Sequence, residues 1–219
     1  MPHWLDEAYS SAITKQDIGL VHRNLSFAPI VSCLISFIFN KKGRFIDFGG
    51  GYGLLTRIMR DKGYEYYRYD TYCENLFAKD FDKVSPASPD YELLTAFELF
   101  EHLVNPVEEL KEMLKWSTNI FFSTEIQKPD LKSPEDWWYI MPETGQHIAF
   151  YTVKSLRLLG EKFNLNFYTN GVNLHLFTKN KISPIKFKLS TTYLSAKLLD
   201  YFASKNESLL MKDYNLSKV

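Results

Sequence analysis

The sequence predicts an α/β fold with a mostly parallel sheet, and three observations lead to this prediction. Short apolar segments, typical of buried strands, alternate with amphipathic segments of helical period through the middle of the chain. The first of these strands is followed at once by a glycine-rich turn, GGGYG at 49–53, and then by a helical segment. The chain has 219 residues, which suits one α/β domain with room for a core.

The N-terminal part of the chain contains the first two helices and the first two strands. Residues 5–40 have a helical pattern, with a break expected near Phe27–Pro29 because proline interrupts helices. The apolar run RFIDF at 44–48 predicts a short strand. The segment LLTRIMRDKG at 54–63 is amphipathic and closes on a glycine, as helices commonly do. The segment YEYYRYD at 64–70 alternates and is rich in aromatic residues, which favours a strand.

The middle of the chain continues the alternation. Residues 71–90 are rich in loop-forming residues. The apolar segments YELLTAF at 91–97 and TNIFFST at 118–124 predict two buried strands. Between them, PVEELKEMLKW at 106–116 predicts a helix with proline at its first position, where the missing N–H costs nothing.

The C-terminal part predicts a helix at 152–162 and two strands at 164–169 and 172–178. Before them lies a polar loop that contains three prolines and the pair Trp137 and Trp138. The tail from residue 181 onward predicts one amphipathic helix near 191–205 and a polar end.

Composition limits the class of partner. Basic and acidic residues balance at 26 each, whereas proteins that bind phosphate backbones usually carry a basic excess. Nucleic acid is therefore disfavoured as a partner. The apolar run from Phe27 to Phe39 is broken by Pro29, Ser32 and Ser36 and is shorter than the roughly 20 residues of a membrane span. We read it as a buried helix and expect no membrane span.

The ends and the cysteines predict a cytoplasmic location. The N-terminal sequence MPHWLDEAYS has early acids and no apolar segment of the kind that signal peptides contain. The two cysteines, Cys33 and Cys73, have no metal-type spacing. One disulfide between them is feasible, but reduced thiols in a cytoplasmic protein are the preferred interpretation.

The glycine turn has the chemistry of a nucleoside-binding site. Gly49, Gly51 and Gly53 let the backbone turn tightly and let a ligand approach the main chain. The helix that follows offers its first N–H groups to a carboxylate or phosphate. Asp70 ends the next strand, 23 residues after Asp47, and such an acid accepts hydrogen bonds from both hydroxyls of a ribose. A tight strand-to-helix turn without a ligand is the simpler alternative.

The sequence DFGGGYG resembles the first motif of class I S-adenosylmethionine-dependent methyltransferases. The resemblance implies that the acid at Asp47 orients the glycine loop and cofactor atoms, and that Asp70 binds the ribose of S-adenosylmethionine. It also implies a Rossmann-like sheet of seven strands, with helices on both faces and the order 3-2-1-4-5-7-6. The further residues expected at the cofactor are Phe48, Thr71, Phe97, and Asp80 with Phe81, the last two as candidates to meet the adenine.

The stretch FELFEHL, residues 97–103, gathers two acids and a histidine. On a helix, Glu98, Glu101 and His102 would stand at positions i, i+3 and i+4 and share one face. They follow the apolar strand 91–97, and ligands bind at the carboxyl ends of strands in a doubly wound sheet.

Two segments extend the resemblance to a subgroup of these methyltransferases. YELLTAFELFEHLVNPVEEL resembles its fourth-strand region, which ends in E-x-x-E-H, and WWYIMPETGQHIAFYTVKSLRLL resembles a later segment with a histidine. Ubiquinone-biosynthesis and small-RNA 2′-O-methyltransferases in this subgroup hold a divalent ion there. The resemblance implies that Mg²⁺, Mn²⁺ or Zn²⁺ would be bound by four ligands: Glu98, Glu101, His102 and His147.

Three interpretations of this acid–histidine group stay open at the level of the sequence. A bound divalent ion would lower the pKa of an acceptor hydroxyl. Without an ion, His102 or His147 would act as a general base, with Glu98 capping a turn or touching the cofactor. A purely structural role, with the histidine bonding backbone, is the third. Another histidine, His175, lies in a strand-like segment and is read as a core residue.

The expected activity is methyl transfer from S-adenosylmethionine to a hydroxyl of a small molecule, with a sugar or sugar derivative favoured. The aromatic loop at Trp137, Trp138 and Tyr139 would form one wall of the acceptor site, or would pack between loop and sheet. The alternatives are RNA 2′-O-methylation and a cofactor-binding domain without activity. We expect one domain, divided into a helical cap at 1–40, a catalytic core at 41–180 and a helix with a tail at 181–219.

Overall fold

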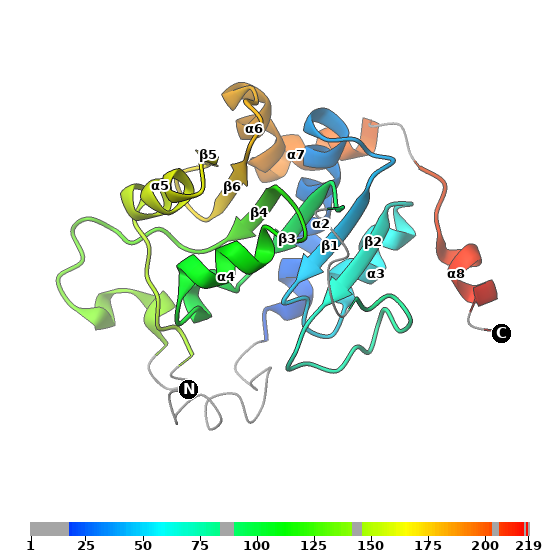
Figure 1. Cartoon of the computed structure of the whole chain (residues 1–219), viewed down its shortest axis with the longest axis horizontal. Helices are drawn as coiled ribbons and strands as arrows, with labels where there is room; N and C mark the ends of the chain where they lie inside the picture. The colour runs from blue at the N-terminus through cyan, green and yellow to red at the C-terminus, as the bar shows by residue number, and fades with distance from the viewer. Residues whose placement is uncertain (1–17, 84–89, 142–145, 203–205, 217, 219) are drawn as a thin grey trace.

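The computed structural model describes residues 18–83, 90–141, 146–202, 206–216 and 218. Within them one sheet of six strands has the order β2-β1-β3-β4-β6-β5 (Figure 1). The strands are β1 (Arg44–Phe48), β2 (Glu65–Tyr69), β3 (Leu93–Ala96), β4 (Asn119–Ser123), β5 (Asn166–Thr169) and β6 (Leu174–Thr178). The first four are mutually parallel, whereas β6 is antiparallel to β4 and to β5. The α/β class and the antiparallel final strand are thus confirmed.

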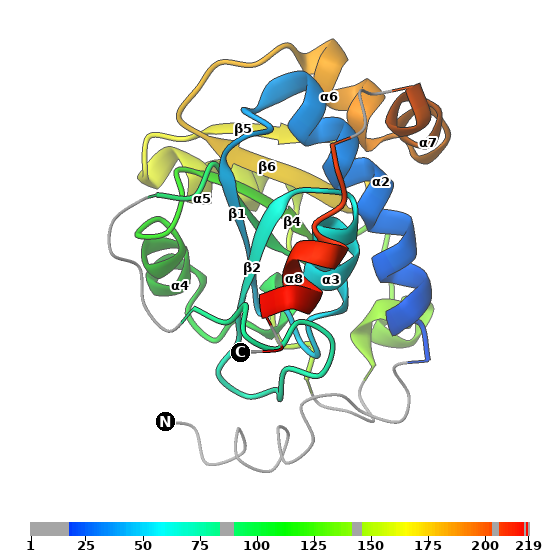
Figure 2. The same cartoon turned by 90° about the vertical axis from the view of Figure 1, so that its right-hand side faces the viewer.

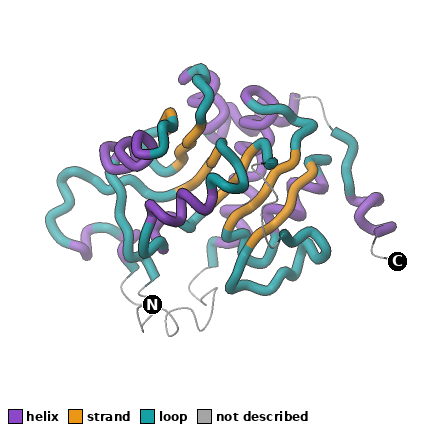
Figure 3. The backbone as a smooth tube through the Cα atoms, viewed as in Figure 1, coloured by secondary structure: helices purple, strands orange, loops and turns teal. Residues whose placement is uncertain are grey.

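The sheet has six strands in the described residues rather than the seven expected. Removing the outermost strand from the expected order leaves the observed order, so the missing strand is the one beside β2. Its place is taken by a single parallel bridge between Arg68 and Asp82, in a segment that Figure 3 draws as loop. Asp80, just before the bridge, has φ +75°, a left-handed conformation that strand residues do not adopt. The described part of this segment therefore turns instead of extending.

Helices cover both faces of the sheet. One face carries α2 (Leu20–Ile38), α3 (Leu54–Asp61), α6 (Pro184–Thr191) and α7 (Tyr193–Phe202). The other face carries α4 (Pro106–Met113) and α5 (Val153–Lys162), whose apolar side chains pack on β1, β3 and β4. The last helix, α8 (Leu210–Leu216), lies beside α3 and β2 (Figure 2).

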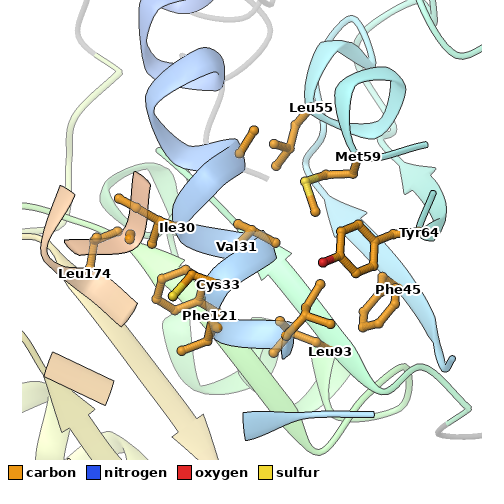
Figure 4. Close-up of a cluster of buried hydrophobic side chains, with 14 of the residues drawn as sticks. Ile30, Val31, Cys33, Phe45, Leu55, Met59, Tyr64, Leu93, Phe121 and Leu174 are labelled. Carbon is orange, nitrogen blue, oxygen red and sulfur yellow. The ribbon is translucent and has the colours of Figure 1, made fainter. Parts of the chain in front are cut away.

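Helix α2 runs unbroken through Pro29, so the expected break near Phe27–Pro29 is wrong. An interior proline costs about 3 kcal/mol. The turns that follow it bury Ile30, Val31, Leu34 and Ile35 almost completely against the sheet. Burial of one such side chain contributes roughly 1.5–3 kcal/mol, so together they outweigh the proline. Figure 4 shows Ile30 and Val31 of α2 among the buried side chains of this face.

By length and composition alone, α2 is the described helix that could cross a membrane. Its apolar side is committed to the core described above, and 39% of the apolar window is buried inside the domain. A core helix passes the same length and composition test as a membrane span. The expectation of a buried helix for this segment therefore agrees with its packing.

The C-terminal segment differs from the expected single helix at 191–205. Two short helices, α6 and α7, adjoin at Thr192, and α8 follows after residues 203–205, which lie outside the described part. Ser183 caps α6 with its hydroxyl on the Lys186 N–H, with Pro184 at the first position. Thr192 adopts an extended conformation (φ −90°, ψ 118°), which ends α6 before α7 begins.

Helix α8 is held to α3 by a buried ion pair. Asp213 accepts hydrogen bonds from Arg60 Nε at 2.8 Å and Nη2 at 2.7 Å, a bidentate arrangement. Arg60 is 3% exposed and Asp213 7% exposed. Arg57 Nη2 also lies 3.0 Å from Asp213. The tail is therefore part of the packed domain and not a free polar end.

Candidate active site

The candidate site lies where β1, β2, β3 and β4 end, at the carboxyl edge of the parallel strands. Each strand delivers one functional segment there: the glycine turn after β1, Asp70 after β2, Glu98 to His102 after β3, and Thr124 after β4. Parallel register aligns these ends, with Asp47 opposite both Arg68 and Thr95. The topology thus gathers residues far apart in the sequence, as the doubly wound architecture predicts.

The glycine turn requires glycine for its backbone shape. Gly49, Gly51 and Gly53 have φ values of +72°, +53° and +83°, all in the left-handed region. A Cβ at Gly53 would also lie 2.6 Å from the Asn75 side-chain oxygen. Two backbone hydrogen bonds hold the turn. The Gly49 N–H donates to the Tyr69 carbonyl of β2, and the Gly53 N–H donates to the Gly50 carbonyl within the turn.

The N–H groups of Gly49 and Gly53 are thus occupied within the protein and are not donors for a ligand. The first N–H groups of α3 have no intrahelical acceptor, as at every helix start. They follow directly after Gly53. The N-terminus of α3 is therefore the part of this turn that can meet a carboxylate.

Asp70 is placed at the glycine turn but is already engaged. Its Oδ2 accepts from the Gly51 N–H at 2.9 Å, and its Oδ1 accepts from Tyr72 and Cys73 N–H groups at 2.9 and 2.8 Å. A carboxylate has about four lone-pair sites, so one remains, on Oδ2. In this conformation Asp70 has capacity for one ribose hydroxyl and not for the two that the sequence analysis expected.

Arg68, which the sequence analysis did not select, fastens the glycine turn to the next strand. This buried guanidinium donates from Nε to the Gly51 carbonyl at 2.6 Å and from Nη1 to Asp82 at 2.7 Å. It also bonds the Cys73 carbonyl. A charged residue inside the alternating strand YEYYRYD was the available signal, because an arginine at such a position needs partners.

Asp47 lies beneath the turn in a buried polar chain. Its Oδ1 accepts from Thr95 Oγ1 at 2.7 Å, and Thr95 Oγ1 lies 3.0 Å from the Tyr66 hydroxyl. Burial raises the pKa of Asp47 to about 7, partly offset by the Thr95 hydrogen bond. Asp47 sits under Gly50, where an added Cβ would lie 2.8 Å from its Oδ2. The geometry fits the expected role of positioning the turn.

Not all of the expected cofactor residues reach the site through their side chains. Phe48 packs its ring on Tyr69, with centroids 4.8 Å apart, in the core on the α4 side. Thr71 is exposed just after Asp70. Phe97 is half-buried, and its ring lies 4.5 Å from Phe27 of α2.

Phe81, which was expected at the adenine together with Asp80, packs against α3. The ring of Phe81 covers the Arg60 guanidinium at 3.6 Å. The segment runs parallel to β2 at the bridge between Arg68 and Asp82. Asp80 and Phe81 come before this bridge, so they lie on the side of the amino-terminal ends of the strands. Ligands of such sheets lie at the opposite, carboxyl end. The selection of Asp80 and Phe81 as adenine contacts is not supported by this placement.

The stretch after β3 is not one helix, so the expected shared face of Glu98, Glu101 and His102 is wrong. A short 3₁₀ helix covers Phe100–His102 alone, and Glu98 has φ +51°, outside any right-handed helix. Ser123 holds this conformation, because its hydroxyl accepts from the Glu98 N–H at 2.8 Å and donates to Glu98 Oε1 at 2.6 Å. Arg23 Nε of α2 lies 3.8 Å from Glu98 Oε2.

Glu101 is fully buried, and neither of its carboxylate oxygens has a hydrogen-bond partner among the residues that the structure describes. Burial, followed by the nearby charge of Glu98, raises the pKa of Glu101 well above its usual range. The hydroxyls of Tyr139 and Thr124 approach it and counter this rise without meeting hydrogen-bond geometry. Burying a charged carboxylate without a partner is costly. The arrangement therefore favours either a protonated Glu101 or a cation bound to it.

The two histidines are oriented by backbone carbonyls. His102 Nδ1 lies 2.9 Å from the Gln146 carbonyl, and His147 Nδ1 lies 2.6 Å from the Tyr139 carbonyl. A carbonyl can only accept, so each Nδ1 carries the hydrogen and each Nε2 carries the lone pair. The two rings are 4.9 Å apart at an interplanar angle of 81°. Burial lowers the pKa of His147.

Three of the four expected metal ligands come together. The ligand atoms of Glu101, His102 and His147 all lie within 4.8 Å of one another. Two ligand atoms on one ion are at most about 4.6 Å apart at bond lengths near 2.0–2.3 Å, so the group is close to a binding geometry. A carboxylate and two imidazoles oriented by carbonyls are donor types that suit a divalent ion. Glu98 is adjacent but bonds Ser123 instead.

The aromatic residues expected at the acceptor site differ in their burial. Trp137 and Tyr139 are buried, and the ring of Tyr139 contacts His147 in a tilted arrangement with centroids 4.6 Å apart. Trp138 is 73% exposed.

His175 is fully buried, with Nε2 2.9 Å from the Thr124 carbonyl, and burial lowers its pKa to about 4. This agrees with a core histidine. Both cysteines are free thiols, Cys33 buried and Cys73 partly exposed.

Comparisons with known proteins agree with this architecture. A family model described as a methyltransferase domain matches residues 22–170. No curated protein matches the sequence. A chain of the complex between the Haloferax volcanii Trm112 methyltransferase activator and the putative methyltransferase superposes with a TM-score of 0.57 at 11% identity, covering 80% of this chain and 98% of that one.

Two further solved structures have the same fold. The plantazolicin methyltransferase BpumL, in complex with a monoazolic desmethylPZN analog and SAH, has a TM-score of 0.55 at 14% identity over 80% of this chain and 94% of that one. An O-methyltransferase family 2 protein from Planctomyces limnophilus, in complex with apigenin, has a TM-score of 0.51 at 14% identity over 78% of this chain and 63% of that one. Since the family match extends over well more than half of the residues, this chain belongs to the methyltransferase domain family and is a class I S-adenosylmethionine-dependent methyltransferase.

Proposed function

We propose that this methyltransferase is an O-methyltransferase whose acceptor is a hydroxyl group of a small molecule, with a sugar or sugar derivative as the expected class. One observation carries the proposal: the Glu101, His102 and His147 ligand atoms converge within 4.8 Å at the carboxyl edge of the sheet. Such a group serves an acceptor whose proton must be removed. The O-methyltransferase with apigenin is a neighbour of the same fold and supports this direction.

The cofactor side of the reaction rests on the glycine turn. S-adenosylmethionine, when bound, supplies the electrophilic methyl group. The N-terminus of α3 would receive its carboxylate, and Asp70 Oδ2 has one lone pair left for a ribose hydroxyl. Arg68 and Asp47 would keep the turn in shape from below. Positioning is the main task of the protein, because the methyl and the attacking oxygen need an in-line approach.

The acceptor side has two routes, and the same residues serve both. His147 stays neutral near pH 7, because burial lowers its pKa, and its Nε2 can take a proton from an acceptor hydroxyl. A divalent ion held by Glu101, His102 and His147 would lower the pKa of that hydroxyl and stabilise its developing charge. In either case Tyr139 fixes the His147 ring through its carbonyl and through the contact of its tilted ring.

The test is a transfer assay with radiolabelled S-adenosylmethionine and a panel of sugars, nucleotide sugars, phenols and RNA. We expect label on a small-molecule hydroxyl. His147→Gln should lower kcat by at least about 100-fold, because it removes a base or a ligand. Exposed His22→Gln is the control. Binding of S-adenosylhomocysteine without turnover of any acceptor would contradict the proposal, as would label found on RNA alone.

A second arm separates the two acceptor routes. Chelation by EDTA, followed by return of Mg²⁺, Mn²⁺ or Zn²⁺, should abolish and restore turnover if an ion takes part. If turnover survives EDTA and kcat falls as pH drops below the His147 pKa, the histidine acts as base without an ion. Turnover that is insensitive to EDTA, to pH and to His147→Gln would remove the acid–histidine group from the mechanism.

A further inference from the structure

The outer face of α6 and α7 exposes an unusual amount of apolar surface. We call it the α6–α7 face and define it by six exposed residues: Ile185, Leu189, Leu194, Leu198, Tyr201 and Phe202. Their exposed fractions run from 49% for Leu189 to 78% for Phe202. Exposed apolar side chains that gather on two successive helices mark an interaction site more often than scattered single residues do.

The pattern on α7 shows that the apolar stripe points outward. Leu194, Leu198 and Tyr201 stand at positions i, i+4 and i+7, which share one side of a helix. Ala196, on the opposite side, is fully buried in the core that α2 forms with the sheet. Helix α7 therefore packs through Ala196 and the partly buried Leu199, while Leu194, Leu198 and Tyr201 remain exposed.

Charge on the same segment is strongly one-sided, although the whole chain is neutral. Residues 179–202 contain a single acid, Asp200, which lies 2.6 Å from Lys62 of the neighbouring α3 loop and is thereby neutralised. Against it stand five lysines, all exposed: Lys179, Lys181, Lys186, Lys188 and Lys197.

These two properties select the occupant of the face. A symmetric contact with a second copy would bring the same lysines against each other, because an isologous interface pairs a patch with itself. A nucleic acid would leave the leucines and Phe202 without apolar contact. An anionic bilayer surface satisfies both properties, since apolar and aromatic side chains enter the headgroup boundary while lysines extend to the phosphates.

We propose that the α6–α7 face docks this methyltransferase on the surface of an anionic membrane. The proposal goes beyond methyl transfer and does not depend on it. The first residue of α7, Tyr193, also lines a cavity of about 360 Å³ together with Phe27, Ile30 and Leu174. The ring of Phe27 contacts Phe97 at the carboxyl edge, so a residue that lines this cavity also contacts the edge where the candidate active site lies.

The test is co-sedimentation of the full chain with vesicles of phosphatidylcholine, with and without phosphatidylglycerol. Wild type should bind the anionic vesicles and be released by salt. Lys188→Gln and Lys197→Gln should each weaken binding about fivefold. Phe202→Gln and Leu198→Gln should each weaken it about tenfold by removing inserted apolar area.

Matched controls come from α5, on the opposite face of the sheet. Leu158 is 55% exposed, against 54% for Leu198, and Lys154 is exposed like Lys197. Leu158→Gln and Lys154→Gln should leave vesicle binding unchanged. Thermal unfolding of each variant verifies that it is folded, which exposed positions should permit.

Three results would overturn the proposal. Wild type could stay in the supernatant with anionic vesicles, or it could bind phosphatidylcholine vesicles equally well, which would remove the role of the lysines. Alternatively, sedimentation velocity could show a dimer that Leu198→Gln dissociates, which would assign the face to a second copy.

Discussion

At the scale of single residues, Asp47 makes a prediction about pH. Its folded-state pKa is about 7, against an ordinary value of 3.8. Between these values the folded protein keeps a proton that the unfolded chain has lost, so this group lowers stability as pH rises from about 4 to 7. At about 1.36 kcal/mol per pKa unit, the change is on the order of 4 kcal/mol.

The measurement is urea unfolding of wild type and Asp47→Asn across that pH window. The asparagine variant should lose this component of the pH slope, and its stability relative to wild type should rise with pH. Exposed Asp130→Asn serves as the control. Equal pH slopes for wild type and Asp47→Asn would show that Asp47 ionises normally in the folded protein.

Glu101 makes a separate prediction about metal. Its unpartnered, buried oxygens gain a partner when a divalent ion binds, so Mn²⁺ or Zn²⁺ should raise the melting temperature of wild type. At 100 times the dissociation constant the gain is about 2.7 kcal/mol. Glu101→Gln should lose most of it. Glu125→Gln, a half-buried acid nearby, should keep it. The same metal response in Glu101→Gln would exclude Glu101 as a ligand.

Residues at the site differ in how far the sequence predicts them. The glycines and Asp70 follow from local chemistry, because a turn with positive φ needs glycine and a strand-terminal acid is visible in the sequence. The roles of Arg68 and Ser123 do not follow from local chemistry. The partners of Arg68 are set by the strand register, and Ser123 bonds Glu98 because Glu98 has a left-handed backbone. Such contacts depend on tertiary placement, which single-sequence patterns do not contain.

At the scale of elements, α8 makes a stability prediction. Asp213→Asn breaks its bidentate contact with Arg60 in a buried place, which should lower the free energy of unfolding at pH 7 by about 3 kcal/mol. Burial alone would raise the pKa of Asp213. The contacts with Arg60 and Arg57 outweigh burial, so the pKa is lowered. This stabilisation is therefore present above the ordinary pKa and is lost as pH falls through the folded-state value.

Urea unfolding at neutral and acid pH checks this prediction. The stability gap between wild type and Asp213→Asn should close as the pH falls below about 4. Asp61→Asn removes an exposed partner of Arg57 and should cost no more than about 1 kcal/mol. If Asp213→Asn were as stable as wild type at pH 7, α8 would contribute nothing to the domain.

The elements themselves were largely predictable in type and less so in their ends. Strands β1 to β6 fall within the expected segments, because apolar runs between turns are a strong local signal. The errors occur where tertiary packing decides: α2 continues through Pro29, only Phe100–His102 of the stretch after β3 is helical, and the tail divides at Thr192. In each case a local rule was outweighed by burial or by a side-chain contact.

At the scale of the whole molecule, the sheet order follows from topology rules that the sequence carries only as alternation. Parallel strands joined by helices must place their carboxyl ends together, so the site location was predictable before its geometry. The absence of a seventh strand from the described residues was not predictable, because it depends on how the segment around Asp80 turns. The α6–α7 face likewise required the structure, since a helical pattern alone does not say which side is buried.

The central claim is that the glycine turn and Asp70 hold the adenosyl cofactor, and isothermal titration with S-adenosylhomocysteine tests it most directly. Wild type should bind one equivalent. Asp70→Asn keeps an acceptor for the Tyr72 and Cys73 N–H groups but loses the carboxylate charge, and should bind at least about tenfold more weakly. Asp80→Asn, at a residue that lies before the bridge at Asp82, should bind like wild type. Absence of binding by wild type, or equal affinities for wild type and Asp70→Asn, would contradict the account.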